Sequence, residues 1–109
     1  MTELILPEPI ATYFDADTRD SESVARCFAQ AAVVIDERQT HSGREAIKAW
    51  KAAASAKYSY SSEPFALEQE DERYIVTSRL TGNFPGSPVD LRYAFRLEGG
   101  KITSLEITP

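Results

Sequence analysis

The hydrophobic pattern of this chain changes once, near Tyr58, and that change constrains the fold more than any other feature. Before it, apolar residues recur at the three- and four-residue intervals of helices; after it, they alternate with polar residues, as half-buried strands do. Residues 89–97 alternate most clearly, and on one face they place Val89, Leu91, Tyr93, Phe95 and Leu97. Helices grouped before a meander of strands predict an α+β fold, in which a curved antiparallel sheet packs on the helices.

The first half of the chain predicts three helices and one short strand. The first helix covers residues 7–17, and the second covers residues 21–31 behind an Asp20 cap. The β-branched run at residues 32–37 predicts a strand. "SGRE" at residues 42–45 is typical of a capping box, which would open a third helix over residues 43–58.

The second half predicts four strands and little else. They cover residues 58–69, 73–84, 89–97 and 102–108. "PGSP" at residues 85–88 predicts a turn, and "EGGK" at residues 98–101 predicts a tight hairpin between the last two strands.

Length and charge limit the possible functions. The 109 residues suit one domain, residues 1–109, and a formal net charge of −5 argues against nucleic-acid or anionic-membrane partners. One cysteine, Cys27, excludes an internal disulfide and suits a reducing compartment. We see no signal peptide at the N-terminus and no apolar stretch long enough to span a membrane, so we expect a cytoplasmic protein.

Four segments carry a resemblance to a known family: "YFDADTRD", "CFAQAAVVIDE", "THSGREAIKAW" and "YAFRLEGGKITSLEI". With them the chain resembles the NTF2-like superfamily, and its SnoaL-like branch most closely. The resemblance implies a cone in which three N-terminal helices pack on a strongly curved mixed or antiparallel sheet, with an apolar pocket at the open end. It also implies a homodimer formed through the outer face of the sheet. The superfamily includes ketosteroid isomerases, polyketide cyclases, dehydratases and non-catalytic dimers, so fold alone does not name the activity.

Asp36, at the end of the predicted first strand, is the main catalytic candidate. It lies eight residues after Phe28, the spacing that the ketosteroid isomerase pattern gives its general-base aspartate. By that resemblance it would face the pocket and remove a proton next to a carbonyl or activate water. The alternative is a structural aspartate bonded to a loop amide or paired with Arg38.

Two tyrosines are candidates to stabilise an oxyanion in such a reaction. The strand alternation places Tyr93 on the inward face, and the resemblance places it near the acidic oxyanion donor of the isomerases. Tyr13 lies in the first helix, where the isomerases carry their catalytic tyrosine, but the register leaves open whether Tyr13 or Thr12 faces the pocket. Either tyrosine could instead be a core residue whose hydroxyl bonds to water or a backbone carbonyl.

The only histidine, His41, invites a dyad with Asp36, although a solvated turn residue is the simpler interpretation. Without a second histidine or cysteine nearby, it does not predict a metal site. We expect the substrate-binding wall to contain the large apolar residues and His41; the alternative for the apolar residues is a filled core. The expected wall residues are Phe14, Phe28, Trp50, Phe65, Phe84, Leu91, Phe95 and His41.

Two functional hypotheses follow. The first is a protein that binds a small hydrophobic carbonyl compound. If it is catalytic, it isomerises, cyclises, hydrates or dehydrates that compound without a cofactor, with Asp36 as general base. The second is a non-catalytic dimeric binding or interaction module whose pocket is filled. An open cavity beside Asp36 would favour the first, and a packed interior would favour the second.

Overall fold

The computed structural model describes residues 4–109, so the first three residues of the N-terminal stretch lie outside it. Its helices are α1 (Glu8–Asp17), α2 (Ser21–Arg26) and α3 (Arg44–Lys57). Its strands are β1 (Phe28–Asp36), β2 (Gln39–Ser42), β3 (Tyr60–Glu70), β4 (Arg73–Gly82), β5 (Val89–Glu98) and β6 (Lys101–Thr108). No helix within residues 4–109 has both the length and the apolarity needed to cross a membrane.

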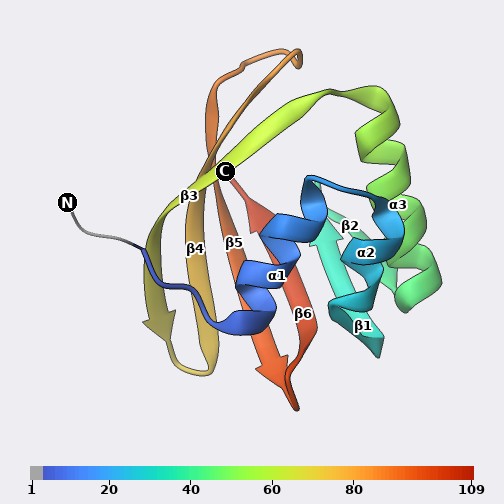
Figure 1. Ribbon diagram of the computed structural model, residues 1–109, viewed down its shortest axis with the longest axis vertical. Coiled ribbons are helices and arrows are strands. Elements are labelled where there is room, and N and C mark those ends of the chain that lie inside the picture. The colour runs from blue at the N-terminus through green and yellow to red at the C-terminus, as the bar shows by residue number, and fades with distance from the viewer. Residues whose placement is uncertain (1–3) are drawn as a thin grey trace.

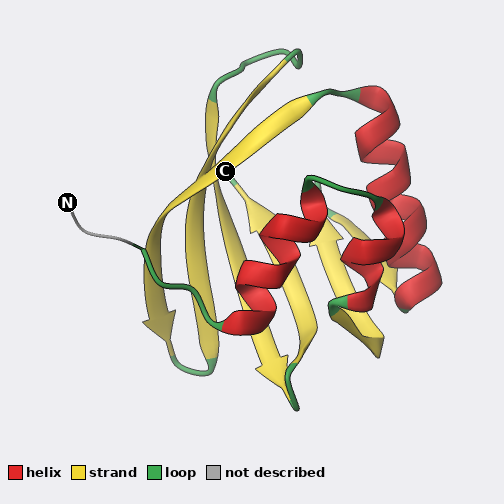
Figure 2. Cartoon of the chain, in the orientation of Figure 1, coloured by secondary structure: helices red, strands yellow, loops and turns green. Residues whose placement is uncertain are grey.

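The strands form one six-stranded sheet in the order β2-β1-β6-β5-β4-β3. β1 and β6 run parallel and every other neighbouring pair is antiparallel, so the sheet is mixed. Figure 1 shows the sheet bending strongly along β3 and β4, with the three helices grouped against the other strands. The separation of helices from strands is plain in Figure 2. The α+β fold predicted from the sequence is confirmed.

The core lies between the helices and the inner face of the sheet. In α1 the apolar stripe predicted from the sequence is buried: Ile10, Tyr13 and Phe14 lie on one face. In α2 the predicted cap is also present, because the Asp20 carboxylate accepts a hydrogen bond of 2.7 Å from the Ser23 amide. This bond lowers the pKa of Asp20. The inward faces of β4, β5 and β6 complete the core.

The second helix is shorter than the sequence pattern predicts. It ends at Arg26, and residues 28–31 begin β1 instead of continuing the helix. Phe28 pairs with Ile102 of the parallel strand β6, and the Ile102 amide donates to the Cys27 carbonyl at 3.0 Å. A short run such as "FAQAA" suits either a helix or a buried strand, and the pairing with β6 selects the strand.

The strand β2 was not predicted, and it corrects the interpretation of His41 as a turn residue. β1 and β2 form a hairpin whose two-residue turn is Glu37–Arg38, with φ of 52° and 66°. His41 lies within β2, opposite Val34. Two positive φ values are typical of the type I′ hairpin turn, which usually carries Asn-Gly, so the sequence gives little sign of it.

The capping box predicted for α3 is wrong. The residue before the helix is Gly43, with φ of 87°, and no side chain caps the helix start. Ser42 is the last residue of β2, and the Gly43 amide donates to the Ala32 carbonyl at 2.8 Å. The hairpin thus fixes the backbone at the position where a serine cap would have to turn. A positive φ explains why glycine occupies position 43.

Candidate active site

A cavity of about 400 Å³ opens at the end of the sheet where α3, the start of β3 and the β4–β5 loop meet. These elements lie in the upper part of Figure 1. Its walls combine charges, phenols and apolar side chains. The charged lining residues are Asp36, Glu37 and Lys51; the phenols are Tyr13, Tyr58, Tyr60 and Tyr93; the apolar group includes Leu80, Phe84, Val89, Leu91 and Ile107.

Asp36 lies on the wall of this cavity at the end of β1. The indole Nε1 of Trp50 donates a hydrogen bond of 3.0 Å to Asp36 Oδ2. Oδ1 makes no hydrogen bond to residues 4–109. Every fully buried side-chain oxygen in that range has a hydrogen-bond partner, so Oδ1 is not fully buried. Oδ1 is therefore open to the cavity or to solvent. The alternative pairing of Asp36 with Arg38 is not found within the described chain.

Tyr13, not Thr12, is the first-helix residue that faces the cavity. Thr12 is exposed on the other side of α1 and donates to the Glu8 carbonyl at 2.8 Å. Tyr13 is only 1% exposed, and burial raises its pKa well above the usual range, with the negative charge of Asp17 adding to the rise. Its hydroxyl thus stays protonated and can act only as a neutral donor or acceptor.

Tyr93 lines the cavity beside Tyr13, and the two ring centroids are 6.4 Å apart. The alternation of β5 predicted its inward orientation, and Tyr93 is 4% exposed. Burial is the main cause of its raised pKa; the charge of Asp17 adds to it, and the Ser62 hydroxyl offsets part of it. All three predicted catalytic residues, Asp36, Tyr13 and Tyr93, line one cavity.

A buried ion pair that the sequence analysis missed lies beside these residues. Lys51 in α3 pairs with Asp17 at the end of α1, and both side chains are 5% exposed. Lys51 also donates to the Tyr60 hydroxyl, which in turn lies 3.1 Å from Asp17 Oδ1. Burial raises the pKa of Tyr60, as does the adjacent Asp17 carboxylate.

The signal for this pair was present in the helical stripes. Lys51 continues the buried stripe of Ile47 and Trp50 at the i+4 position. Asp17 stands seven residues after Ile10, on the stripe that holds Tyr13 and Phe14. Two apolar stripes that each include one charge of opposite sign indicate a buried pair.

The structure divides the apolar residues expected in the binding wall. Trp50, Phe84 and Leu91 line the cavity. Phe14, Phe28 and Phe95 instead pack in the core below it, where their rings contact Tyr13 at centroid distances of 5.2, 5.9 and 5.5 Å. The core interpretation holds for these three, because they are buried and do not line the cavity.

Phe65 and His41 are not part of the cavity wall. Phe65 is 50% exposed on the outer face of the sheet, 5.8 Å from the Arg79 guanidinium. The alternation of β3 turns Pro64 inward and Phe65 outward, and Phe65 lies where the register with β4 is irregular. His41 makes no hydrogen bond with Asp36 within the described residues; its ring lies 6.0 Å from that of Trp50.

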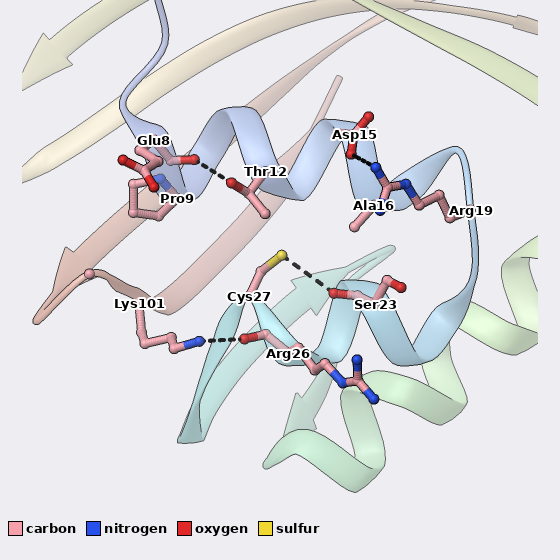
Figure 3. A pocket seen from close by; sticks show the side chains of 11 residues that line it. Glu8, Pro9, Thr12, Asp15, Ala16, Arg19, Ser23, Arg26, Cys27 and Lys101 are labelled. Atoms are coloured by element: carbon pink, nitrogen blue, oxygen red, sulfur yellow. Dashed lines mark hydrogen bonds and ion pairs between the residues drawn. The ribbon is translucent and has the colours of Figure 1, made fainter.

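A second cavity, of about 510 Å³, lies between α1, α2 and the β5–β6 turn (Figure 3). Its polar groups largely satisfy one another. Arg19 pairs with Asp15, the Lys101 ammonium donates to the Arg26 carbonyl, and the Cys27 thiol points at the Ser23 carbonyl. Burial raises the pKa of Cys27, which disfavours the reactive thiolate. The groove therefore offers less chemistry than the cavity beside Asp36.

No cluster within residues 4–109 brings together three His, Cys, Asp or Glu side chains that could hold a metal ion. The groups available at the Asp36 cavity are thus carboxylates, phenols, one ammonium and one indole. Such a set can accept and donate protons and can bind an oxygen that gains negative charge.

Solved structures show the same architecture in other proteins. A protein from Sinorhizobium meliloti, provisionally named a polyketide cyclase, is 40% identical, with a TM-score of 0.89 over 94% of this chain and 95% of its own. A hypothetical protein from Catenulispora acidiphila with a ketosteroid isomerase-like fold, crystallised with trimethylamine, is 21% identical, with a TM-score of 0.83 over 96% and 87%. The epoxide hydrolase/cyclase-like enzyme SalBIII is 20% identical, with a TM-score of 0.76 over 92% and 86%.

The last two likenesses show the fold alone, because their identities are low. No curated protein matches the sequence. The SnoaL-like domain family matches residues 10–105, nearly the whole chain, and the resemblance stated from the sequence is confirmed. With the fold and the family match in agreement, the chain belongs to the SnoaL-like domain family.

Proposed function

We propose that this protein is a cofactor-free enzyme that moves a proton on a small hydrophobic carbonyl compound, with Asp36 as the general base. One observation carries the proposal. Asp36 stands on the wall of an open cavity, and the Tyr13 and Tyr93 phenols line the same space. Trp50 holds one oxygen of the carboxylate, and the other has no hydrogen-bond partner within residues 4–109. A fixed base beside neutral donors is the minimum set for enolisation.

The proposed step uses only groups of this chain. Asp36 Oδ1 takes a proton from the carbon next to the substrate carbonyl, and the electron pair of that C–H bond forms the enolate double bond while the carbonyl electrons move to oxygen. A phenol of Tyr93 or Tyr13 donates a hydrogen bond to the enolate oxygen. Return of the proton from Asp36 to another carbon gives an isomer. In ring closure the enolate carbon instead attacks a second carbonyl, whose π electrons move to its oxygen, and Asp36 returns the proton to that oxygen.

The ring-closing outcome draws support from the relative in Sinorhizobium meliloti, whose name proposes polyketide cyclase activity at 40% identity. Cyclisation of a polyketide begins with the same enolate, so one base serves both outcomes. The apolar group of Leu80, Phe84, Val89 and Leu91 suits a hydrophobic carbon skeleton. We therefore propose a conjugated or polyketide-like ketone as the substrate class.

Deuterium exchange of 2-tetralone, a bicyclic ketone with acidic α-protons, tests the proposal. In D₂O, the wild-type protein is expected to speed loss of the α-proton NMR signals over the buffer rate. Asp36→Asn should bring the rate back to that of buffer, because the amide cannot take the proton. Asp90→Asn, which removes an exposed carboxylate on the sheet, is the matched control and should exchange as fast as wild type. Exchange that survives Asp36→Asn would remove Asp36 from the mechanism.

The competing hypothesis is a non-catalytic module with a filled pocket. A cavity of about 400 Å³ weighs against a filled interior, but a ligand carrier would also have one. A carrier binds 2-tetralone, seen as chemical-shift changes of Tyr13 and Trp50, without speeding exchange. If 2-tetralone binds but its α-protons exchange no faster than in buffer over the whole range from pH 6 to 9, the carrier hypothesis is favoured.

We also propose that two copies pair through the outer face of the sheet. Phe65 supports this, because it places a half-exposed aromatic side chain on the outer face, which pairing of two copies would bury. Light scattering should give a mass near 24 kDa, twice the 12.1 kDa of one chain. Phe65→Glu should reduce it to one chain, whereas a wild-type mass of one chain at micromolar concentration would refute the dimer.

A further inference from the structure

Among residues 4–109, Lys51 is the only cation that lines the Asp36 cavity. It follows Trp50 in α3, whose indole holds the base. The Lys51 ammonium lies 5.3 Å from the centroid of the Trp50 ring and 5.1 Å from that of the Tyr60 ring, and both side chains belong to the cavity wall. The Lys51 side chain is 5% exposed. The ammonium forms an ion pair with Asp17 and donates a hydrogen bond to the Tyr60 hydroxyl. The reaction described above gives this buried ammonium no role.

The hydrogen bonds of Lys51 leave one donor for a ligand. An ammonium has three N–H groups and no lone pair, so it acts as a donor and not as a nucleophile. One N–H serves the Asp17 carboxylate and a second serves the Tyr60 hydroxyl. Tyr60 is fully used, because its oxygen accepts from Lys51 and its hydroxyl donates to Asp17. The third ammonium N–H remains, on a residue that forms part of the cavity wall.

The charges of the cavity orient any ligand that carries oxygen. Asp36 and Glu37 place negative charge on one part of the wall, and Lys51 places positive charge on another. Burial raises the pKa of Tyr13, Tyr60 and Tyr93, and the charges of Asp17 and Asp36 add to the rise, so these phenols stay neutral. Among the described residues of the cavity wall, Lys51 is the one positively charged donor for an oxygen that gains negative charge.

We propose that Lys51 binds the carbonyl oxygen of the substrate and stabilises it as an enolate, and that Asp17 and Tyr60 are the positioning residues that hold the ammonium in place. This inference rests on the proposed function and deepens it. It names the substrate class as ketones with acidic, phenol-like enols, whose charged form an ammonium stabilises more strongly than a neutral phenol does. Asp17 offsets the cost of burying the ammonium before the substrate arrives.

The probe is 2-naphthol, a bicyclic phenol whose neutral and anionic forms absorb at different wavelengths. It is bound to the Asp36→Asn protein, in which the competing carboxylate is removed. Free phenols ionise near pH 10, and Lys51 is expected to shift the bound probe towards the anion at pH 8. Adding Asp17→Asn and Lys51→Met together removes both charges of the pair and should lower the anionic fraction at least tenfold.

A second variant tests whether Lys51 contacts the ligand or only pairs with Asp17 to stabilise the fold. Asp17→Asn in the Asp36→Asn background leaves the ammonium charge uncompensated, so the anionic fraction of bound 2-naphthol should rise. A structural pair predicts no such rise. The inference is overturned if the anionic fraction is the same in all three proteins, or if 2-naphthol fails to bind the folded Asp36→Asn protein.

The outcomes also distinguish this inference from the proposed function. If 2-tetralone exchange depends on Asp36 but the ionisation of 2-naphthol ignores Lys51, Asp36 is the base and the enolate is bound elsewhere. If naphtholate forms through Lys51 but exchange does not depend on Asp36, the oxygen site stands and the base has been misassigned.

Discussion

Asp36 differs from an ordinary surface aspartate because one of its oxygens is held and the other is open. The 3.0 Å bond from the Trp50 indole fixes the carboxylate plane against α3. A base whose geometry is set before the substrate binds needs no reorganisation during the reaction. The orientation therefore depends on a residue that is itself only 9% exposed and packed in the helix.

Trp50→Phe tests this orientation, because phenylalanine keeps an aromatic ring but has no donor. A hydrogen bond to a charged group contributes about 1.5–3 kcal/mol, so we expect the saturated exchange rate of 2-tetralone to fall about tenfold or more. The measurement is the α-proton NMR signal at increasing ketone concentration. Phe84→Leu, which alters the wall without touching Asp36, should weaken binding and leave the saturated rate close to wild type. An unchanged rate in Trp50→Phe would mean that the indole does not position the base.

Residue patterns predicted part of the site and missed part. Spacing and strand alternation indicated Asp36 and Tyr93, and the helical stripe indicated Tyr13, although choosing it over Thr12 needed the structure. Lys51 and Asp17 were missed because a charge on an apolar stripe has meaning only when its partner is known. That partner lies 34 positions away in sequence (51 minus 17), and only the tertiary fold brings the ends of the two side chains together.

At the scale of elements, the Lys51–Asp17–Tyr60 cluster ties α1, α3 and β3 together beside the cavity. The tie crosses the junction between the helices and the sheet edge. A buried ion pair adds little net stability compared with apolar residues, but removing one partner leaves an unpaired charge. The cluster is thus expected to be sensitive to single changes and tolerant of paired ones.

Lys51→Met should lower the free energy of unfolding by about 3–5 kcal/mol, because it leaves the Asp17 carboxylate buried without its cation. Asp17→Asn combined with Lys51→Met should cost less than Lys51→Met alone, since no charge is then left unpaired. Urea unfolding followed by circular dichroism measures both. Additive losses in the double variant would show that the two side chains do not interact.

The β1–β2 turn offers a prediction of the opposite sign. Glu37 and Arg38 both have positive φ, a conformation that glycine and asparagine adopt at lower cost. Glu37→Asn with Arg38→Gly should raise the free energy of unfolding by about 0.5–2 kcal/mol. The same urea titration detects this gain, and the exchange rate of 2-tetralone tests whether Glu37 matters to the site. A loss of stability would show that Glu37 or Arg38 makes a contact worth more than the strain.

The order of most helices and strands was predictable, because long segments with a regular hydrophobic period show whether they are helix or strand. The four C-terminal strands and the first and third helices follow the sequence pattern closely. The start of β1 and all of β2 did not, because pairing with other strands decides them. Phe28 pairs with Ile102 of β6, whose amide donates to the Cys27 carbonyl, and the hairpin with β1 creates β2. The failed capping box at Ser42 follows from the same hairpin.

At the scale of the whole molecule, burial of phenols links stability to alkaline pH. Burial and nearby carboxylates raise the pKa of Tyr13, Tyr60 and Tyr93 in the folded protein. In the unfolded chain these groups ionise near pH 10, so above that pH the folded state holds more protons. Stability contributed by the neutral phenols is thus complete below pH 10 and falls as the pH rises, by up to about 1.4 kcal/mol per pH unit for each tyrosine.

Comparison of wild type with Tyr93→Phe isolates one of these phenols. Between pH 10 and 11.5, the slope of unfolding free energy against pH should be shallower in Tyr93→Phe by up to about 1.4 kcal/mol per unit. Lysines that titrate in this range affect both proteins alike and cancel in the comparison. Parallel slopes would indicate that Tyr93 ionises freely in the folded state, against its 4% exposure.

The crystal structure of the Asp36→Asn protein with 2-tetralone is the most direct test of the account, because it asks where the substrate lies. The account predicts the ketone inside the cavity of about 400 Å³, with an α-carbon within about 3.5 Å of the residue 36 side chain and the carbonyl oxygen towards Lys51. Ketone bound only in the groove between α1 and α2 or on the outer face of the sheet, with the Asp36 cavity empty of it, would contradict the account.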